Sequence, residues 1–347
     1  MTLVAGLSIG GMPAFVGDLL LSWRLKTGAS IPTRNEDAPY ECADGQYIAG
    51  LAQKLVIVRA YLLVAWSGTY SEARRLIQEL DKVLPDREAE LHGYDVAFEI
   101  LNTCAEGTEL VALFITEKSV RPFGVRTRGF ELDNRRIYLL GSGAAEFFEY
   151  LQQHAEVLPA QETPDGIAAR AALLRFASQS LVFQWKVQTG LEHAWGGGFE
   201  IAYPTREGFK KIGNTLFRAW LVDEGGISHS SGRSFFSRYC AQDLHLSCFA
   251  PGDQTHIIPS LVGERALVPE FESVHPEWTL DTYFIKSTGA IVDFARYHPP
   301  HRPVKDVMRF AKGELVGWAM DREYVEQCAR RAVVSSARGR SFEISRY

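Results

Sequence analysis

Residues 2–18 read TLVAGLSIGGMPAFVGD, and this stretch decides the fold that the sequence predicts. Its first eight residues are rich in strand formers, and Gly10-Gly11 suits a tight turn that needs positive φ. The chain then returns through Met12–Val16, and Gly17-Asp18 ends the second strand. We therefore expect a β-hairpin that brings Asp18 back beside the start of the first strand.

The order of the elements after this hairpin favours antiparallel sheets with helices on their outer faces. Residues 26–53 are polar and contain glycine and proline, so we expect a long loop there. Segments 54–58 and 61–66 are nearly continuous apolar runs, which are typical of buried strands. Further strands are expected at 94–101, 110–116, 126–140 and 199–203, and helices at 69–84, 144–154 and 164–186.

The helix expected after residue 68 has the clearest amphipathic pattern. Thr69 and Glu72 have the spacing of a capping box, and Pro85 ends the helix. One helical face carries the apolar residues Ala73, Leu76, Ile77, Leu80 and Leu84.

The composition excludes several classes of protein. With 46% hydrophobic and 23% charged residues the chain is ordinary for a globular protein, which argues against disorder, collagen and coiled coil. A net charge of −5 gives no basic footprint for nucleic acid, and no run of 18 apolar residues predicts a membrane span. Five scattered cysteines favour free thiols, and the first residues lack the basic region of a signal peptide. We therefore expect a cytoplasmic protein.

The amino-acid composition of the sequence changes from Pro204 onward. Residues 223–260 are rich in Gly, Ser and His, a hairpin is expected at 283–297, and a helix at 321–334. An arginine-rich tail follows, for which a solvated terminus is the default. We expect two domains, 1–203 and a loop-rich mixed α/β extension at 204–347.

Thr2 is the residue with the most chemical meaning. Methionine is normally trimmed before a small second residue, which would leave Thr2 with a free α-amine. Its hydroxyl is then the nucleophile and its own amine the base, a known activated arrangement. The α-amine has an ordinary pKa of about 7.7–8.0, close to what a general base needs. The competing interpretation is that threonine is simply a common second residue.

Three further residues strengthen the catalytic interpretation. The hairpin places the Asp18 carboxylate near Thr2, and Lys54 opens the following strand. A lysine there keeps the amine neutral by like-charge repulsion and stabilises a developing alkoxide. Gly68 precedes a helix N-terminus, where unpaired N–H groups can serve an oxyanion.

These residues, in this order, resemble the proteasome β-subunits and their bacterial relatives among the N-terminal-nucleophile hydrolases. The resemblance covers about the first 200 residues. The matching stretches are Thr2-Leu-Val-Ala with Asp18, Lys54-Leu-Val-Ile-Val, Ala65-Trp-Ser-Gly68-Thr-Tyr-Ser-Glu-Ala73, Leu140-Gly-Ser142-Gly143-Ala, and Thr189-Gly190 through Gly197-Gly198.

The resemblance implies a four-layer αββα sandwich in which helices lie outside two antiparallel sheets. It implies hydrolysis of peptide or amide bonds through an acyl-enzyme on Thr2, with no cofactor and no metal. It assigns Asp18 and Lys54 as supports, the Gly68 N–H as oxyanion donor and Ser142 as a polar partner near the amine. It also implies a ring-like homo-oligomer, while an unfoldase partner stays open.

The sequence departs from the family pattern at two places. Relatives usually carry Asp-x-x-Ser-Gly-Gly before the late strand, whereas this chain has Glu192-His-Ala-Trp-Gly-Gly-Gly198. The link from Asp18 to Lys54 is about twenty residues longer than usual, so Lys26 and Arg34 are rival cations. Two alternatives therefore stay open, a proteasome-like scaffold without hydrolytic activity and a non-peptidase amidohydrolase.

Several other groups of residues are candidates for ligand sites. Ligand-type side chains gather at Cys240, His245, Cys248 and His256, but their spacing matches no zinc pattern. The segment 298–301 is a proline-rich linker, and Gly196–Gly198 lacks the lysine of a phosphate loop. A loop at 230–233 is expected to be flexible rather than anion-binding. His193 beside the glycine run can border the Thr2 site, although a packed or exposed histidine is the commoner case.

Overall fold

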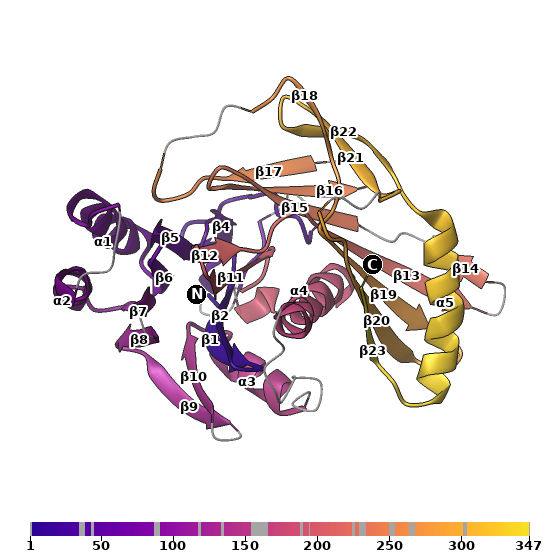
Figure 1. Ribbon diagram of the computed structural model, residues 1–347, viewed down its shortest axis with the longest axis horizontal. Coiled ribbons are helices and arrows are strands. Elements are labelled where there is room, and N and C mark those ends of the chain that lie inside the picture. Colours follow the sequence, from indigo (N-terminus) through magenta and orange to yellow (C-terminus); the bar gives the residue numbers. More distant parts are fainter. Residues whose placement is uncertain are drawn as a thin grey trace. The chain divides into compact units, whose positions relative to one another are not determined.

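The computed structural model in Figure 1 describes most of the chain. The described residues are 2–34, 39–42, 45–86, 91–116, 119–132, 135–153, 166–187, 190–193, 195–223, 226–228, 234–249, 254–263, 268–300 and 304–346. Contacts divide the chain into two compact units. Unit 1 comprises Met1–Ala169, Phe183–Ile212 and Pro259–Glu264, and unit 2 comprises Arg170–Val182, Gly213–Ile258 and Arg265–Tyr347. The domain boundary expected after residue 203 falls inside strand β11.

The predicted N-terminal hairpin is confirmed. Strand β1 (Val4–Ile9) pairs antiparallel with β2 (Met12–Asp18), in a register that puts Val4 opposite Gly17. Gly10 and Gly11 have φ of 54° and 81°, the positive values that this two-residue turn demands. The hairpin is the centre of a six-stranded sheet whose order is β12-β11-β2-β1-β10-β9. The other members are β9 (Arg128–Leu132), β10 (Arg135–Leu140), β11 (Phe199–Thr205) and β12 (Gly208–Lys211).

A second sheet of unit 1 has the order β5-β6-β7-β8. Its strands are β5 (Leu55–Arg59), β6 (Leu62–Gly68), β7 (Thr108–Ile115) and β8 (Val120–Val125). Side chains alternate between its two faces. Leu63 and Ala65 join Val4 and Phe15 of the hairpin in one buried cluster, whereas Val64 and Trp66 face a second cluster.

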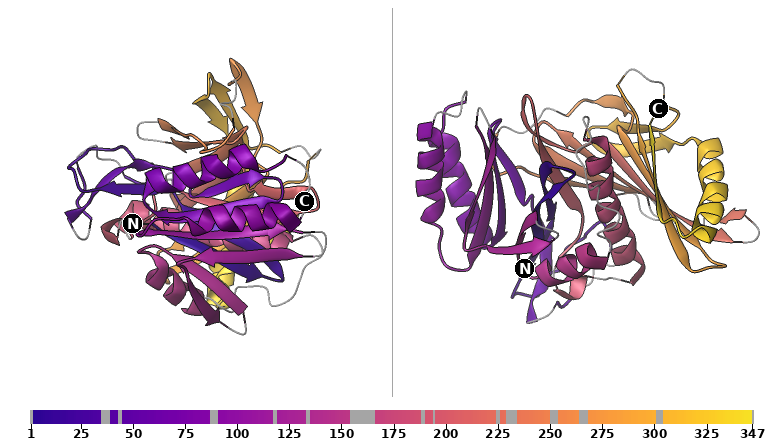
Figure 2. Two further views of the ribbon diagram at one scale, coloured as in Figure 1. Left: turned by 90° about the vertical axis from the view of Figure 1, so that its left-hand side faces the viewer. Right: turned by 60° about the horizontal axis from the view of Figure 1, so that its bottom comes forward.

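Two helices, α1 (Tyr70–Val83) and α2 (Leu91–Asn102), cover the other face of this sheet, as Figure 2 shows. The predicted apolar face of α1 is confirmed, since all five expected residues are buried. The predicted capping box is wrong, because the Thr69 side chain makes no capping hydrogen bond. Glu72 instead accepts hydrogen bonds from Arg75 and from the Ala105 N–H.

The strand expected at 94–101 is also wrong, because these residues lie in α2. Their burial follows a helical period, with Gly93, Ala97 and Leu101 buried and Phe98 exposed. The aromatic and branched side chains that suggest a strand pack instead on the sheet below, where Tyr94 meets Phe114 edge to face. Tertiary packing has overridden local strand preference.

The remaining elements of the first 200 residues are short, apart from one helix. Strands β3 (Leu20–Trp23) and β4 (Tyr47–Leu51) form a two-stranded sheet, so the long loop expected at 26–53 is wrong over its last part. Helix α3 (Ala144–Gln153), helix α4 (Ile167–Val187) and the 3-10 helix η3 (Leu191–His193) follow.

The expected four-layer αββα sandwich is wrong. Of the described residues, 46% are in strands and 24% in helices, and the sheets are mostly antiparallel, so the fold is β-rich. The physical reason lies partly in α4, where residues 171–179 are all buried. An outer covering helix keeps one polar face in water, whereas α4 is an internal helix. Most of α4, Arg170–Val182, also groups with unit 2.

Unit 2 is built on an eight-stranded sheet with the path β17-β16-β15-β13-β19-β20-β23 and β14 paired to β13. The hairpin expected at 283–297 is confirmed, and so is the C-terminal helix, now α5 (Arg322–Ala337). The Asp321 side chain accepts from the Tyr324 N–H as its N-cap. In Figure 1, α5 lies along one face of β19 and β20. The strands are β13 (Thr215–Asp223), β14 (Gly226–Ser228), β15 (Ser234–Cys240), β16 (Asp243–Phe249), β17 (Gln254–Ile258), β19 (Trp278–Ile285), β20 (Ala290–Tyr297) and β23 (Phe342–Arg346).

A smaller sheet completes unit 2, with the order β18-β21-β22. Its strands are β18 (Phe271–Val274), β21 (Val307–Ala311) and β22 (Glu314–Ala319). Within the described parts of both units, none of the helices has the length and the apolar character needed to cross a membrane.

Candidate functional site

The hairpin brings Thr2 and Asp18 into direct contact. The Thr2 hydroxyl donates to Oδ1 of Asp18 at 3.1 Å, and the Leu3 N–H donates to the same oxygen at 3.0 Å. Both Thr2 and Asp18 are fully buried. Oδ2 of Asp18 accepts from the N–H groups of Leu20 at 3.3 Å and Gly196 at 2.7 Å. Both oxygens of the Asp18 carboxylate therefore accept hydrogen bonds, and the Thr2 hydroxyl binds Oδ1.

The turn before α3 closes over the main chain of Thr2. The Gly143 N–H donates to the Thr2 carbonyl oxygen at 3.1 Å. Gly141 has φ of 84°, and a Cβ at this position would lie 2.0 Å from that oxygen. Only glycine fits such a close approach, so the Gly-Ser-Gly stretch holds Thr2 in place through its backbone.

Lys54, the residue just before β5, lies in the same buried region. Its side chain is 1% exposed. The ammonium donates to the Leu20 carbonyl at 3.0 Å and lies 4.4 Å from the centre of the Trp66 ring. The peptide units of Leu20 therefore connect the pair, since its N–H donates to Asp18 and its carbonyl accepts from Lys54.

Burial shifts both ionisable groups toward their neutral forms. It raises the pKa of Asp18, and the positive charge of Lys54 and the hydrogen bonds to the carboxylate oppose this rise. Burial also lowers the pKa of Lys54 to about 8, and the negative charges of Asp18 and Glu200 oppose that fall. Desolvation outweighs the mutual attraction at both groups. An amine with such a pKa exchanges its proton close to neutral pH.

The rival cations Lys26 and Arg34 are placed elsewhere. Lys26 is exposed, and the Arg34 guanidinium lies 5.0 Å from the centre of the Tyr40 ring. Lys54 is the cation whose charge acts on Asp18. The strand expected to open with Lys54 begins one residue later, because β5 starts at Leu55.

Gly68 and Ser142 have other contacts in the structure. Gly68 is exposed at the end of β6, opposite Thr108, and a Cβ at this position would lie 2.1 Å from the Gly107 carbonyl oxygen. The Ser142 hydroxyl donates to the His193 carbonyl at 2.7 Å and is exposed. The residue after Ser142, Gly143, binds the Thr2 carbonyl, but the Ser142 hydroxyl itself binds η3.

Two polar residues of this region are not found by sequence reasoning. Glu200 on β11 accepts from the main-chain N–H of Lys54 at 2.7 Å, and its other oxygen accepts from Lys211 at 2.5 Å. Sequence alone gives little indication that Glu200 is buried, since a glutamate in a predicted strand usually faces solvent. β11 pairs with β2, with Phe199 opposite Asp18, and this pairing brings Glu200 and the glycine run to the site.

His193 borders the outer side of this region. Its Nε2 lies 2.9 Å from Oε1 of Glu146, while Oε2 of Glu146 accepts from the Trp195 indole at 2.7 Å. The imidazole and the carboxylate are partly exposed, at 46% and 37%. The contact positions His193 against α3 at the surface.

The cysteine and histidine group at 240–256 lies on β15, β16 and β17 of unit 2. Cys240 pairs with Asp243, and Leu246 with His256, so the four side chains are spread along these strands. Among the described residues no three Cys, His, Asp or Glu side chains gather as a metal-binding set. The loop 230–233 and His301 lie outside the described residues.

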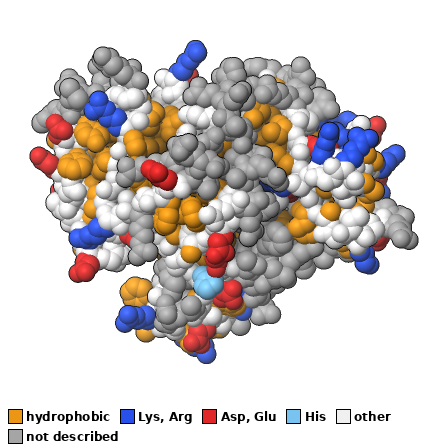
Figure 3. Space-filling model, turned by 90° about the horizontal axis from the view of Figure 1, so that it is seen from below, with side chains coloured by type: hydrophobic (Ala, Val, Ile, Leu, Met, Phe, Trp, Pro, Cys, Tyr) orange, Lys and Arg blue, Asp and Glu red, His pale blue; other side chains and the backbone are white. Residues whose placement is uncertain are grey.

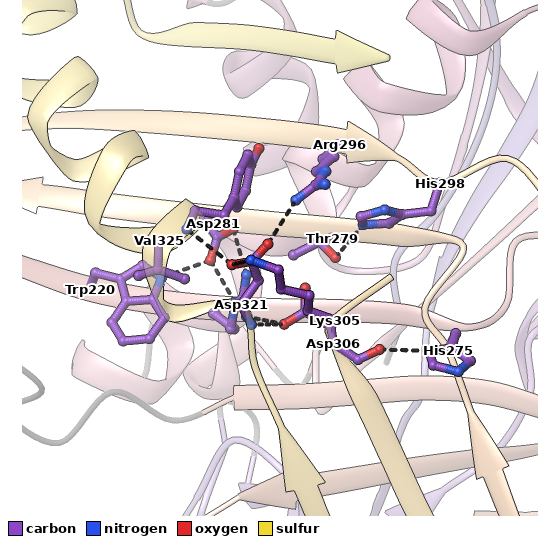
Figure 4. Close-up of polar contacts among 12 residues, drawn as sticks. Trp220, His275, Thr279, Asp281, Arg296, His298, Lys305, Asp306, Asp321 and Val325 are labelled. Atoms are coloured by element: carbon purple, nitrogen blue, oxygen red, sulfur yellow. Dashed lines mark hydrogen bonds and ion pairs between the residues drawn. The ribbon is translucent and has the colours of Figure 1, made fainter. Parts of the chain in front are cut away.

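Unit 2 contains a separate buried polar network, whose carboxylates and histidines appear in Figure 4. Arg218 donates to Asp281 through Nε and Nη2, at 2.7 and 2.9 Å, and to Asp306 through Nη1 at 2.9 Å. The Trp220 indole also donates to Asp281, and Asp306 accepts from the Asp321 N–H. All three ion-pair partners are at most 1% exposed. The network ties β13, β19 and the start of α5 together.

The face in Figure 3 carries acidic, basic and hydrophobic side chains interspersed over its described part. A binding surface for nucleic acid shows a dominant positive sign instead. No known family model matches the chain, and no curated protein matches it.

We expect the stability of this site to depend on pH through Lys54. Its pKa is about 8 in the folded chain and ordinarily 10.5, so the unfolded chain binds more protons between these values. The free energy of unfolding of the wild type should therefore rise with pH across this window, by at most about 3 kcal/mol. Lys54→Met, which keeps an unbranched side chain without the amine, should lack this rise.

Urea unfolding of both proteins, at pH values below and above about 8, measures the difference. A gap between wild type and Lys54→Met that stays constant across the window would contradict the placement of Lys54 in a desolvated site.

Proposed function

We propose that this protein is an N-terminal threonine hydrolase that cleaves peptide or amide bonds. The observation that carries the proposal is the buried contact between the Thr2 hydroxyl and Asp18, with Lys54 acting on the same carboxylate. A nucleophile, an orienting acid and a cation of lowered pKa in one place are the parts that such a reaction needs. The sequence resemblance to proteasome β-subunits supports the same assignment.

The reaction begins once cleavage of the bond before Thr2 has freed its α-amine. The amine takes the hydroxyl proton while Oγ1 attacks the carbonyl carbon, and an ester forms between Thr2 and the acyl group. The C–N bond of the substrate breaks, and the proton passes from the ammonium to the leaving amine. Water then hydrolyses the ester and restores the Thr2 hydroxyl.

Asp18 and Lys54 support these steps without bonding to substrate. The carboxylate orients the hydroxyl, and the positive charge of Lys54 favours the neutral amine and the developing oxyanion. The Gly68 N–H, at the exposed end of β6 just before α1, is the proposed oxyanion donor. The resemblance further supports self-association into a ring in the cytoplasm.

One observation favours the alternative of a proteasome-like scaffold that does not hydrolyse. Thr2 is 0% exposed, so a substrate carbonyl has no direct access to its hydroxyl in this structure. In that case the contact between Thr2 and Asp18 serves only to close the first hairpin. An amidohydrolase acting on small non-peptide amides needs less access, and substrate profiling separates it from a peptidase.

The decisive experiment is covalent labelling of the native protein. Intact mass first shows whether the chain begins at Thr2. Incubation with a peptide β-lactone, which acylates hydroxyl nucleophiles, should then add one acyl group at Thr2, located by peptide mass spectrometry. Thr33→Ala is the matched control, because it removes a buried threonine hydroxyl that makes no hydrogen bond to Asp18 or Lys54. A native protein with a blocked Thr2 amine and no acylation establishes the scaffold instead.

A further inference from the structure

The buried carboxylate of Glu200, on β11, binds the main chain of Lys54. Oε1 of Glu200 accepts from the main-chain N–H groups of Lys54, at 2.7 Å, and Leu55, at 3.2 Å. Glu200 is 1% exposed. A single oxygen therefore holds the first residues of β5 against β11, which sets where the Lys54 side chain begins.

The second oxygen of Glu200 is held by another lysine. Lys211 on β12 donates to Oε2 of Glu200 at 2.5 Å and to the Gln53 side chain at 2.5 Å. The Lys211 side chain is only 10% exposed, and desolvation lowers its pKa, while the charge of Glu200 opposes that fall. Glu200 thus binds the main chain of Lys54 through one oxygen and the ammonium of Lys211 through the other.

We propose that Glu200, with Lys211 as its counter-ion, is a positioning residue that sets the place and the charge of Lys54 beside Asp18. The proposal rests on the proposed function, in which Lys54 supports the Thr2 nucleophile. Glu200 acts through Lys54 and not on substrate. Relatives usually carry an aspartate and a serine before the glycines that precede β11, and this chain has no serine there. Glu200, on β11 itself, supplies polar contacts in their place.

The charges around Lys54 predict opposite effects for two substitutions. The charges of Asp18 on β2 and Glu200 on β11 act on Lys54. Lys211 of β12 binds Glu200, and the Thr2 hydroxyl binds Asp18. Glu200→Gln keeps an oxygen for the two N–H groups but removes a negative charge, so the pKa of Lys54 should fall. Lys211→Met removes a positive charge, so the pKa of Lys54 should rise.

The first test observes Lys54 directly and does not need activity. Lysine enriched in ¹³C at Cε gives one titrating signal per lysine, and Lys54→Met identifies the signal of Lys54. We expect its midpoint to move down by about one unit in Glu200→Gln and up in Lys211→Met. Lys210→Met, which removes the neighbouring exposed lysine paired with Glu207, is the matched control and should leave the midpoint in place.

The second test measures the pH dependence of Thr2 acylation in the wild type, Glu200→Gln, Lys211→Met and Lys210→Met. The alkaline limb of the profile should follow the Lys54 midpoint in each variant. Uniformly slower acylation with an unmoved limb, or an unmoved Lys54 midpoint, would overturn the role of Glu200. Absence of acylation in wild type, with the Lys54 midpoints moving as expected, would instead refute the proposed function on which that role rests.

Discussion

Thr2→Ala is expected to abolish acylation by the β-lactone and to lower the rate of amide hydrolysis by at least about 10³-fold. The substitution removes the oxygen that forms the proposed acyl-enzyme while it leaves the α-amine, Asp18 and Lys54 in place. The lost hydrogen bond from the hydroxyl to Asp18 costs about 1 kcal/mol of stability. A domain with about 5–15 kcal/mol of stability remains folded after such a loss.

Thr2→Ser is the matched control, because it keeps both the hydroxyl and the amine. It should still be acylated at residue 2, and its thermal unfolding should match that of the wild type closely. Hydrolysis by Thr2→Ala at the rate of the wild type would show that another residue carries the reaction. Equal and undetectable rates in all three proteins would favour the scaffold.

Arg218→Ala is expected to give the largest loss of stability of any single change in unit 2, about 3–5 kcal/mol. Removal of the guanidinium leaves the carboxylates of Asp281 and Asp306 buried without a counter-ion. It also removes the bidentate contact between β13 and β19. Chemical unfolding followed by circular dichroism measures the loss as a lower denaturant midpoint.

Two further variants test the reason for this loss. Arg218→Lys keeps the charge but cannot make the forked contact with Asp281, so it should be destabilised less than Arg218→Ala. Arg322→Ala removes an exposed arginine, 73% accessible, that pairs with Glu326 on α5, and should cost at most about 0.5 kcal/mol. A loss in Arg218→Ala as small as that of Arg322→Ala would contradict the structural role of the network.

Local patterns allowed part of the fold to be predicted. The apolar face of α1, the diglycine turn and the helix expected at 321–334 each depend on residues within a few positions of one another. The strand expected at 94–101 failed because its aromatic residues satisfy both a strand and a helix, and only packing on Phe114 decides between them. The prediction that α4 forms an outer layer was wrong, because strands later in the sequence, such as β20, also contact this helix.

The sequence by itself determined the first contact of the candidate site. A turn of two glycines between strands of matched length places Asp18 beside Thr2, and this register needs no other part of the chain. Only the tertiary structure decided the state of Lys54. Its lowered pKa comes from burial and from charges on β2 and β11, and Glu200 lies 146 residues away. Desolvation depends on every segment that covers a group, so no local pattern can report it.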